Sequence, residues 1–488
     1  MLRANHGLRH LQSPFQILNA RDLEGLALHS RRGMIKASFA GLAGLSLPAL
    51  LRARAQSQPD PNPRRAAPAK SVILLWMAGG PSHIDTWDPK PGRPLQNRGP
   101  FAVCQTKLPG VVVCEHLPKC AATLDQFTII RSVDARMSNH EPNTVFQTGN
   151  LLAEARTNPE AVMYPAIGSV VAKHHGPNQH GVPAYIAFQT SRSHLAYGGY
   201  LGKRYDPFLA NPCAKLPVYN DVGKDLGRVT GADFFSLPSG LTPARLGDRQ
   251  GLRTALDAVR RDLDRNPAVA SLDTFHAQAL DMLTGPAMRN AFNLDNEPQP
   301  VRDKFGPHLW CQEALLARRL VAAGAAFVTL DLSYHTASGT WDTHGDNIPP
   351  YGGISKGLGP LLPLFDHLVT TLVDDLRAHN LLDQTLVIAM GEFGRTPTMG
   401  TQESSDGRDH WPAVMSMLLA GGGLRHGQVI GSTEADGGHI KDRPVTPADL
   451  AATIYQHFGI PLHTTYLDPQ ARPRFVVEPG GAPIAELF

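Results

Sequence analysis

Five short apolar runs, each bounded by turn-forming residues, constrain the fold of this chain more than any other feature. The first is Ser71-Val-Ile-Leu-Leu-Trp-Met77, which lies between a linker and Gly79-Gly80-Pro81. The others span residues 127–133, 325–332, 385–390 and 414–419. Continuous apolar runs of this length are typical of strands buried on both faces. We therefore expect five core strands.

The segments between and after these runs predict helices. Apolar residues recur at spacings of three and four between about Gly359 and His379, at Leu361, Phe365, Leu368, Leu372 and Leu376. A strand, a helix and a second strand in this order imply a right-handed crossover and a parallel sheet. A later helix should begin after an N-cap at Thr446 and end at Gly459. The predicted fold class is α/β with a mostly parallel central sheet.

The N-terminal segment has the order of features found in a twin-arginine export signal. Ser30-Arg31-Arg32-Gly-Met-Ile-Lys36 precedes an apolar run over 37–51, and Ala53-Arg54-Ala55 has the small-x-small pattern of a cleavage site. The apolar run is too short to span a membrane. We expect export to the periplasm or the extracellular space; the alternative is a buried amphipathic helix that follows two arginines by chance.

The domain organisation follows from these features. We expect a signal peptide over 1–55, a linker over 56–70 and an α/β domain over 71–485, with a helical insertion at about 150–300. Helical patterns inside that insertion span 252–265 and 269–283. The net charge is +3, with 46 Lys and Arg scattered among 43 Asp and Glu, so the chain lacks the basic surface that nucleic acid requires.

Candidate ligands follow or approach each predicted strand. Ligands of an open parallel sheet bind outside the carboxyl ends of its strands. His83 and Asp85 follow the first run and Ser138 lies in the loop after the second; Asp342 and His344 follow the third, Glu392 and Arg395 follow the fourth, and Arg408, Asp409 and His410 precede the fifth. Each group taken alone is more typical of solvated turns and caps. Five groups at one edge indicate a shared site.

Such a site would need a cation or an anionic substrate to balance its acids. Mixed His and carboxylate ligation suits Zn²⁺ or Mn²⁺, whereas oxygen-rich ligation suits Ca²⁺ or Mg²⁺, and the spacing does not choose between them. Glu392 follows a fully apolar strand, so we expect a metal, Arg395 or Arg408 to satisfy its carboxylate.

Six segments resemble the family called domain of unknown function 1501, which consists of exported bacterial proteins. They are Gly79-Gly-Pro-Ser-His-Ile-Asp-Thr-Trp-Asp-Pro-Lys90, Ala317-Arg-Arg-Leu-Val-Ala-Ala-Gly324, Trp341-Asp-Thr-His344, Gly391-Glu-Phe-Gly-Arg-Thr-Pro397, Gly407-Arg-Asp-His-Trp-Pro412 and Ala420-Gly-Gly-Gly423. That family is similar to the alkaline phosphatase superfamily, which includes sulfatases. The resemblance implies an alkaline-phosphatase-like sheet with helices on both faces and a two-metal site at its carboxyl edge.

The resemblance also implies roles for individual residues. His83 or Asp85, Asp342, His344, Glu392, Asp409 and His410 would be metal ligands, Ser138 the nucleophile, and Arg395 or Arg408 the anion clamp. Phe393 stands where the superfamily has a ligand histidine. The expected function is an exported metal-dependent hydrolase of a small phosphate or sulfate ester or of a sulfated or phosphorylated glycan. The alternative is a degenerate binding or scaffold protein on the same fold.

Overall fold

The computed structural model describes residues 69–488 except for 141–142, 189–193, 211–285, 334–339, 346–352 and 401–402. The proposed export signal, most of the linker and the helical patterns over 252–265 and 269–283 lie outside the described residues. Within the described part of the chain, no helix is both long and apolar enough to cross a membrane.

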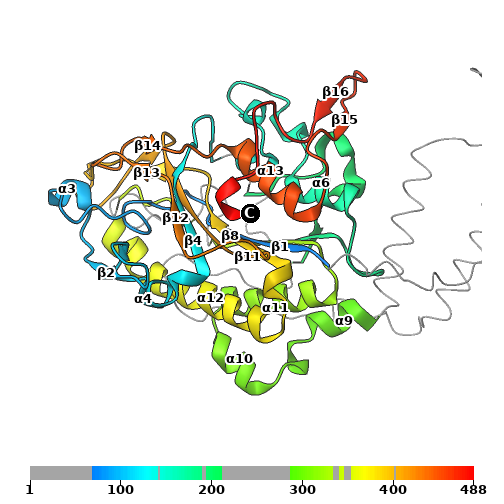
Figure 1. The fold of residues 1–488 in the computed structure, drawn as a ribbon, viewed down its shortest axis with the longest axis horizontal. Helices are drawn as coiled ribbons and strands as arrows, with labels where there is room; N and C mark the ends of the chain where they lie inside the picture. The colour runs from blue at the N-terminus through cyan, green and yellow to red at the C-terminus, as the bar shows by residue number, and fades with distance from the viewer. Residues whose placement is uncertain are drawn as a thin grey trace, which may run out of the picture. The chain divides into compact units, whose positions relative to one another are not determined.

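An eight-stranded sheet forms the centre of the fold (Figure 1). Its strand order is β12 (Gln428–Ile430), β4 (Phe127–Val133), β11 (Met415–Gly421), β8 (Thr385–Met390), β1 (Ser71–Trp76), β7 (Phe327–Asp331), β5 (Tyr185–Phe188) and β6 (Phe208–Leu209). All five predicted strands are confirmed, with boundaries that differ by at most two residues.

The direction of one strand departs from the parallel pattern. β1 pairs in parallel with β7 and β8, and β7 pairs in parallel with β5. β11 runs antiparallel to both β8 and β4, so β4 points the same way as β1 and β8. The residues that precede β11 therefore lie at the same edge as the residues that follow β1, β4, β7 and β8.

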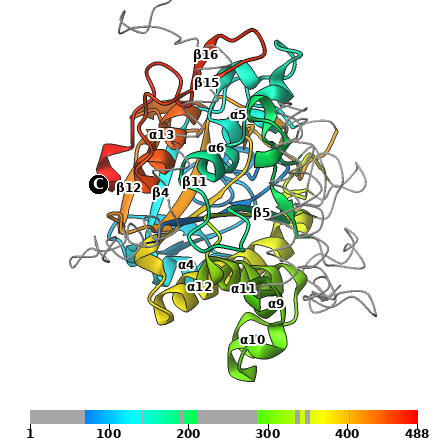
Figure 2. The ribbon, with the colours of Figure 1, turned by 90° about the vertical axis from the view of Figure 1, so that its right-hand side faces the viewer.

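Helices cover both faces of this sheet, as expected (Figures 1 and 2). One face packs against α4 (Pro118–Ala122), α9 (Pro286–Phe292), α10 (Gln299–Phe305), α11 (Leu309–Ala323) and α12 (Gly359–Ala378). The other face packs against α5 (Thr144–Thr148), α6 (Ile167–His174) and α13 (Pro447–Phe458). The side chains of β1 alternate between the two cores, with Ile73 and Leu75 in one and Val72 and Leu74 in the other. This alternation explains why every position of the strand from Val72 to Trp76 is apolar.

The two predicted helices that lie within the described residues are present. α12 begins at Gly359 and ends one residue before His379. At the start of α13 the Thr446 side chain accepts a hydrogen bond from the backbone N–H of Asp449, and the Asp449 carboxylate accepts one from the N–H of Thr446. Gly459 ends this helix in a left-handed conformation, with φ of 70°.

Short elements complete the described chain. They are α3 (Leu95–Arg98), the β2–β3 pair (Val103–Gln105 and Val112–Cys114), β9–β10 (Gly394–Arg395 and His410–Trp411), β13–β14 (Ser432–Thr433 and Ile440–Asp442) and β15–β16 (Thr465–Leu467 and Pro473–Phe475). The expected helical insertion over about 150–300 needs one change. β5 and β6 fall inside that range and are strands of the central sheet, because β5 pairs along its whole length with β7.

Candidate metal centre

Four side chains converge at the carboxyl edge of the sheet. They are His140 from the loop after β4, Asp342 and His344 from the segment after β7, and His410 from β10, which pairs with β9 and precedes β11. Each offers one nitrogen or carboxylate oxygen, and these four atoms all lie within 4.8 Å of one another. Parallel strands bring three of the four together, and the antiparallel direction of β11 brings the fourth.

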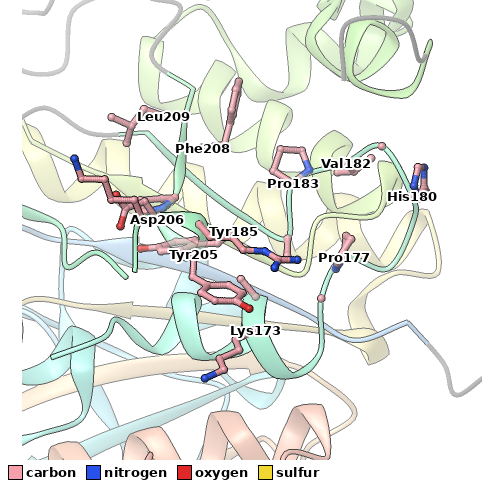
Figure 3. Close-up of a pocket in the computed structure, with 17 residues that line it drawn as sticks. Lys173, Pro177, His180, Val182, Pro183, Tyr185, Tyr205, Asp206, Phe208 and Leu209 are labelled. Atoms are coloured by element: carbon pink, nitrogen blue, oxygen red, sulfur yellow. The ribbon is translucent and has the colours of Figure 1, made fainter. Parts of the chain in front are cut away.

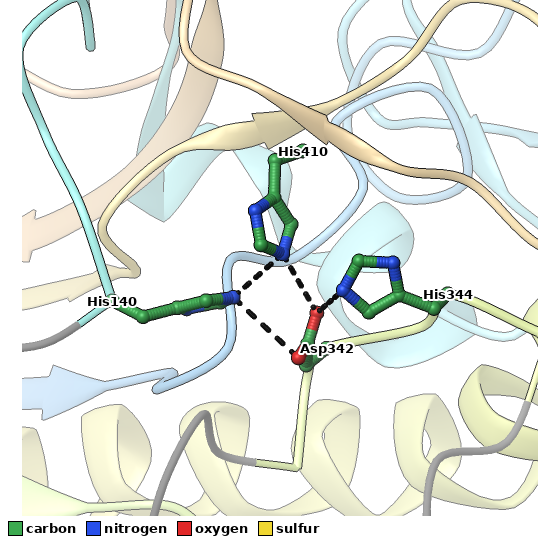
Figure 4. A group of neighbouring side chains, drawn as sticks. All are labelled: His140, Asp342, His344 and His410. Atoms are coloured by element: carbon green, nitrogen blue, oxygen red, sulfur yellow. Dashed lines mark hydrogen bonds and ion pairs between the residues drawn. The ribbon is translucent and has the colours of Figure 1, made fainter. Parts of the chain in front are cut away.

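The three imidazole rings point toward the Asp342 carboxylate (Figure 4). Nε2 of His344 lies 2.9 Å from Oδ1 of Asp342, and Nε2 of His410 lies 3.3 Å from the same oxygen. Nε2 of His140 lies 3.5 Å from Oδ2 of Asp342 and 2.7 Å from Nε2 of His410. The same ring nitrogen of every histidine thus faces one common point.

Acidic side chains lie beside two of these histidines, at the Nδ1 nitrogen of each ring. Nδ1 of His140 donates to Oε1 of Glu392 at 2.7 Å. Nδ1 of His344 lies 3.3 Å from Oδ1 of Asp409. A carboxylate that accepts a hydrogen bond from Nδ1 fixes the ring orientation and the tautomer of the histidine, and it leaves the Nε2 lone pair available to a metal. Glu392 makes this hydrogen bond with His140, whereas the contact of Asp409 with Nδ1 of His344 is not a hydrogen bond. Glu392 and Asp409 therefore lie one layer outside the cluster, whereas the sequence analysis expected them as ligands.

Charge and burial set the protonation of the cluster. Burial works against the charged form of Asp342, but Arg395 and the three histidines outweigh it and hold the pKa of this carboxyl well below its usual range. Burial lowers the pKa of His410 to about 4. The pKa of His140 is also opposed by burial, yet hydrogen bonds with Asp342 and Glu392 raise it above its usual value. Asp342 is therefore an anion beside a neutral His410 at neutral pH.

Arg395 is fully buried and neutralises Asp342. Its Nη2 donates to Oδ1 of Asp342 at 2.5 Å and also to the carbonyl of Gly79, and its Nε donates to the carbonyl of Gly80 at 2.9 Å. These contacts direct the guanidinium at the protein interior. The expected role as an anion clamp does not agree with this placement.

Arg408 and Asp85 form a second buried pair, away from the four converging side chains. Nε of Arg408 lies 2.6 Å from Oδ2 of Asp85, and both residues are at most 2% exposed. The other N–H groups of Arg408 donate to Oδ1 of Asp85 and to the backbone carbonyls of Asn97, Thr396 and Pro397. All five donors are used, so Arg408 has none left for an anion, and Asp85 is balanced without a metal.

Glu392 has partners other than those expected. Besides His140, its Oε1 accepts a hydrogen bond from the backbone N–H of Gly79 at 2.8 Å. Neither arginine contacts it through a recorded hydrogen bond or ion pair. Its second oxygen, Oε2, is buried without a hydrogen-bond partner among the described residues. An arginine was expected beside Glu392, but a histidine and a backbone amide contact its Oε1 instead. A metal at Glu392 stays a prediction.

The last two expected residues lie outside the cluster. Nε2 of His83 lies 2.7 Å from the carbonyl oxygen of Gly437, and burial lowers the pKa of this histidine. Ser138 lies two positions before His140 in the same loop, and its hydroxyl is buried with no hydrogen-bond partner in the described part of the chain.

His140 is the one cluster member that the sequence analysis did not select. The sequence nevertheless indicated His140 as a candidate ligand, because it follows the second core strand in the same way that Asp342 and Glu392 follow theirs. The rule that ligands follow the carboxyl ends of strands, applied to every His and acid, selects His140 as well.

A family model described as "Protein of unknown function (DUF1501)" matches residues 69–488. The chain belongs to this DUF1501 family. No curated protein matches the sequence significantly.

Several solved structures resemble this DUF1501 chain at low sequence identity. "Crystal structure of Ps i-CgsB" is 12% identical, with a TM-score of 0.37 and coverage of 80% of this chain and 72% of that one. The PsFucS1 sulfatase from Pseudoalteromonas sp. is 11% identical, with a TM-score of 0.35 and coverage of 80% and 68%. The phosphonate monoester hydrolase SpPMH from Silicibacter pomeroyi is 13% identical, with a TM-score of 0.31 and coverage of 85% and 75%.

Proposed function

We propose that this protein is a metal-dependent hydrolase of phosphate or sulfate esters, with its metal held by His140, Asp342, His344 and His410. The observation that carries the proposal is the convergence of four ligand atoms within 4.8 Å of one another, three of them imidazole nitrogens. The substrate would be a small anionic ester or a sulfated or phosphorylated glycan.

The cluster fits a metal ion by its own geometry. Nε2 of His140 and Nε2 of His410 face each other at 2.7 Å, although Nδ1 of His140 already donates to Glu392. A cation at this point would take the place of the proton that the two ring nitrogens share and would bind both of them. Three nitrogens and one carboxylate form a donor set that favours Zn²⁺ over the oxygen-preferring Ca²⁺ and Mg²⁺. We therefore propose one zinc ion per chain.

The residues around the cluster would each contribute to catalysis. A metal held here would supply Lewis-acid polarisation of the ester oxygen and stabilise the charge that develops on it. Glu392 fixes the His140 tautomer, and Arg395 keeps Asp342 ionised. We propose Ser138 as the attacking hydroxyl, with a water molecule as the alternative, because Ser138 lies in the His140 loop with an unpaired hydroxyl among the described residues.

One observation favours a degenerate binding or scaffold protein instead. Phe393 is buried, and its ring centre lies 4.7 Å from that of His140 and 4.8 Å from that of His410. An aromatic ring at this place cannot bind a metal, so a second ion beside the first has one ligand fewer. A one-metal site could bind an anion without cleaving it.

Metal analysis and a substrate panel test the proposal. Purified protein should contain about one zinc per chain and should hydrolyse members of a panel of aryl phosphates and aryl sulfates. His410→Ala should lose both metal and turnover, whereas His463→Ala, at an exposed histidine outside the cluster, should keep both. Bound zinc without turnover of any ester supports the scaffold alternative. Absence of bound metal refutes both the metal-dependent hydrolase and the one-metal anion-binding site.

The nucleophile is tested separately. If Ser138 attacks, Ser138→Ala should abolish turnover while the zinc content stays unchanged. If water attacks, turnover of the variant should stay within a few-fold of the unmodified protein.

We also propose export through the twin-arginine pathway. The support is the order of Arg31-Arg32, the short apolar run and Ala53-Arg54-Ala55. Replacing Arg31 and Arg32 by lysine should leave the precursor in the cytoplasm. Normal periplasmic accumulation of this double variant would refute the pathway, without any bearing on the metal centre.

A further inference from the structure

A cavity lies at the edge of the sheet opposite the metal centre (Figure 3). Its lining comes from residues 176–185, which lead into β5, and from 203–209, which lead into and form β6, together with the last part of α6. Because β5 and β6 run parallel to β1 and β7, the segments before them lie at the amino edge, away from the metal centre. The cavity measures about 830 Å³, which is within the range of small-molecule sites.

Most of the ionisable Lys, Arg, His, Asp and Glu side chains that line this cavity are basic. Lys173, His180, Lys203 and Arg204 line it, and Asp206 is the one acid among its described lining residues. Oδ1 of Asp206 accepts a hydrogen bond from the backbone N–H of Gly198 at 2.8 Å, so this carboxylate is partly engaged by the chain itself. The lining therefore attracts an anion.

The walls between these charges are apolar and aromatic. Tyr205 and Lys173 lie on one side of the cavity, and Phe208 and Leu209 lie on the other. The guanidinium of Arg204 lies over the Tyr205 ring, 5.6 Å from the ring centre. Rings and cations in one cavity suit a ligand that has both a flat body and a negative charge.

We propose that this cavity is a binding site for a ring-bearing oxyanion, such as a sulfate, sulfonate or phosphate group attached to an aromatic or sugar ring. Lys203 and Arg204 hold the anionic group, and Tyr205 and Phe208 contact the ring. The Lys203-Arg204 pair follows a glycine-rich turn that the metal centre does not use. The site is independent of the proposed hydrolase activity because it lies at the other edge of the sheet.

Titration with a non-hydrolysable pair of probes tests the proposal on the full chain. Benzenesulfonate carries a ring and a charge, whereas benzenesulfonamide has almost the same shape and is neutral. Calorimetry should show one benzenesulfonate bound per cavity, and the sulfonamide should bind about tenfold more weakly. Equal affinity for the two probes, or no binding of either, overturns the proposal on the unmodified protein alone.

Two charge-matched variants locate the bound probe. Lys203→Gln with Arg204→Gln should weaken benzenesulfonate binding by about five- to tenfold, a size set by two solvent-exposed charge contacts. Lys304→Gln with Lys441→Gln removes the same charge outside the cavity lining and should leave the affinity unchanged. An equal loss in both double variants would show non-specific attraction and refute the site.

A third variant separates this cavity from the metal centre. His344→Ala removes a member of the metal cluster and should leave benzenesulfonate affinity unchanged. Loss of binding in His344→Ala together with full binding in the Lys203 and Arg204 double variant would place the probe at the metal centre and overturn the inference. Thermal unfolding of each variant shows whether it is folded.

Discussion

Two buried aspartates at the same edge of the sheet have opposite surroundings. Asp85 and Asp342 are each 2% exposed, and each pairs with an arginine that is fully buried. Arg408, the partner of Asp85, donates all of its N–H groups to this acid and to backbone carbonyls. Around Asp342, three histidines converge as well, and the side chain of His410 keeps 34% exposure. The first group is closed, and the second is open to a ligand.

This difference shows that the groups around a buried loop carboxylate indicate its role. They distinguish an acid of a structural ion pair from an acid that can bind a ligand. Asp85 is balanced by its arginine with no imidazole beside it, and this pair holds the structure together. Asp342 also has an arginine, but three imidazole nitrogens face it as well, so this group offers ligand atoms. Glu313 on α11 is a third case. It is buried, and burial together with the charge of Asp331 raises its pKa to about 8, so it takes up a proton instead of a cation.

The largest expected effect is a loss of stability when the buried Asp85–Arg408 pair is broken. Asp85→Asn leaves the buried guanidinium of Arg408 without its counter-charge, so the free energy of unfolding should fall by about 3–5 kcal/mol in urea titrations. The zinc content of the folded fraction should stay unchanged. The double variant Asp85→Ala with Arg408→Met should recover part of the lost stability. A variant that loses metal and keeps its stability would move Asp85 into the metal centre.

The next effect concerns Glu313 and depends on pH. Its pKa is raised in the folded protein, so its neutral form stabilises the fold below about pH 4.5 and this contribution is lost as the pH rises toward 8. Glu313→Gln should therefore be more stable than the unmodified protein at pH 8, by about 4 kcal/mol, and no more stable at pH 4.

Urea unfolding at both pH values measures this difference. Glu434→Gln, at an exposed glutamate, is the matched control and should change neither value. Equal effects of Glu313→Gln at pH 4 and pH 8 would contradict the proposed protonation.

A smaller effect is expected on the zinc affinity of the cluster around Asp342. His344→Ala removes one of four ligands, so zinc affinity should fall by at least about 100-fold, which corresponds to about 2.7 kcal/mol. The stability of the metal-free protein should fall by less than in Asp85→Asn, because no unpaired charge is left behind. Competition with a chromophoric chelator measures the affinity. An unchanged affinity would exclude His344 as a ligand.

The smallest effect compares the two acids behind the histidines. Glu392→Gln should lower zinc affinity by about tenfold, because Glu392 is fully buried and lies 2.7 Å from His140. Asp409→Asn should lower it by about two- to threefold, because its side chain is 38% exposed and lies 3.3 Å from His344. An Asp409 effect larger than the Glu392 effect would contradict the order that burial implies.

Local signals predicted much of the fold. The apolar runs predicted β4 and β8 to the residue, because a strand buried on both faces is mostly apolar along its length. Thr446 and Gly459 predicted both ends of α13, because capping depends on neighbouring residues only. The strand β5 was not predicted, because four residues are too few to show a pattern.

The candidate site was predicted only in part. Asp342, His344 and His410 were selected because each lies next to a core strand, and the structure brings them together. The same rule also selected Asp85 and Arg408, which pair with each other instead. Sequence position gives the edge of the sheet where a side chain lies, but it does not give the side chain that faces it across the loops.

The sequence by itself therefore determined five of the eight strands of the central sheet, the parallel direction of most of them and the edge where polar loops gather, since these depend on hydrophobic pattern and chain direction. The tertiary structure decided which polar groups meet. The antiparallel direction of β11 brings His410 to the cluster, and the contact of Glu392 with Nδ1 of His140 places that glutamate outside the group of four converging side chains. Both result from contacts between residues far apart in the chain, where distance and burial determine how each charge is balanced.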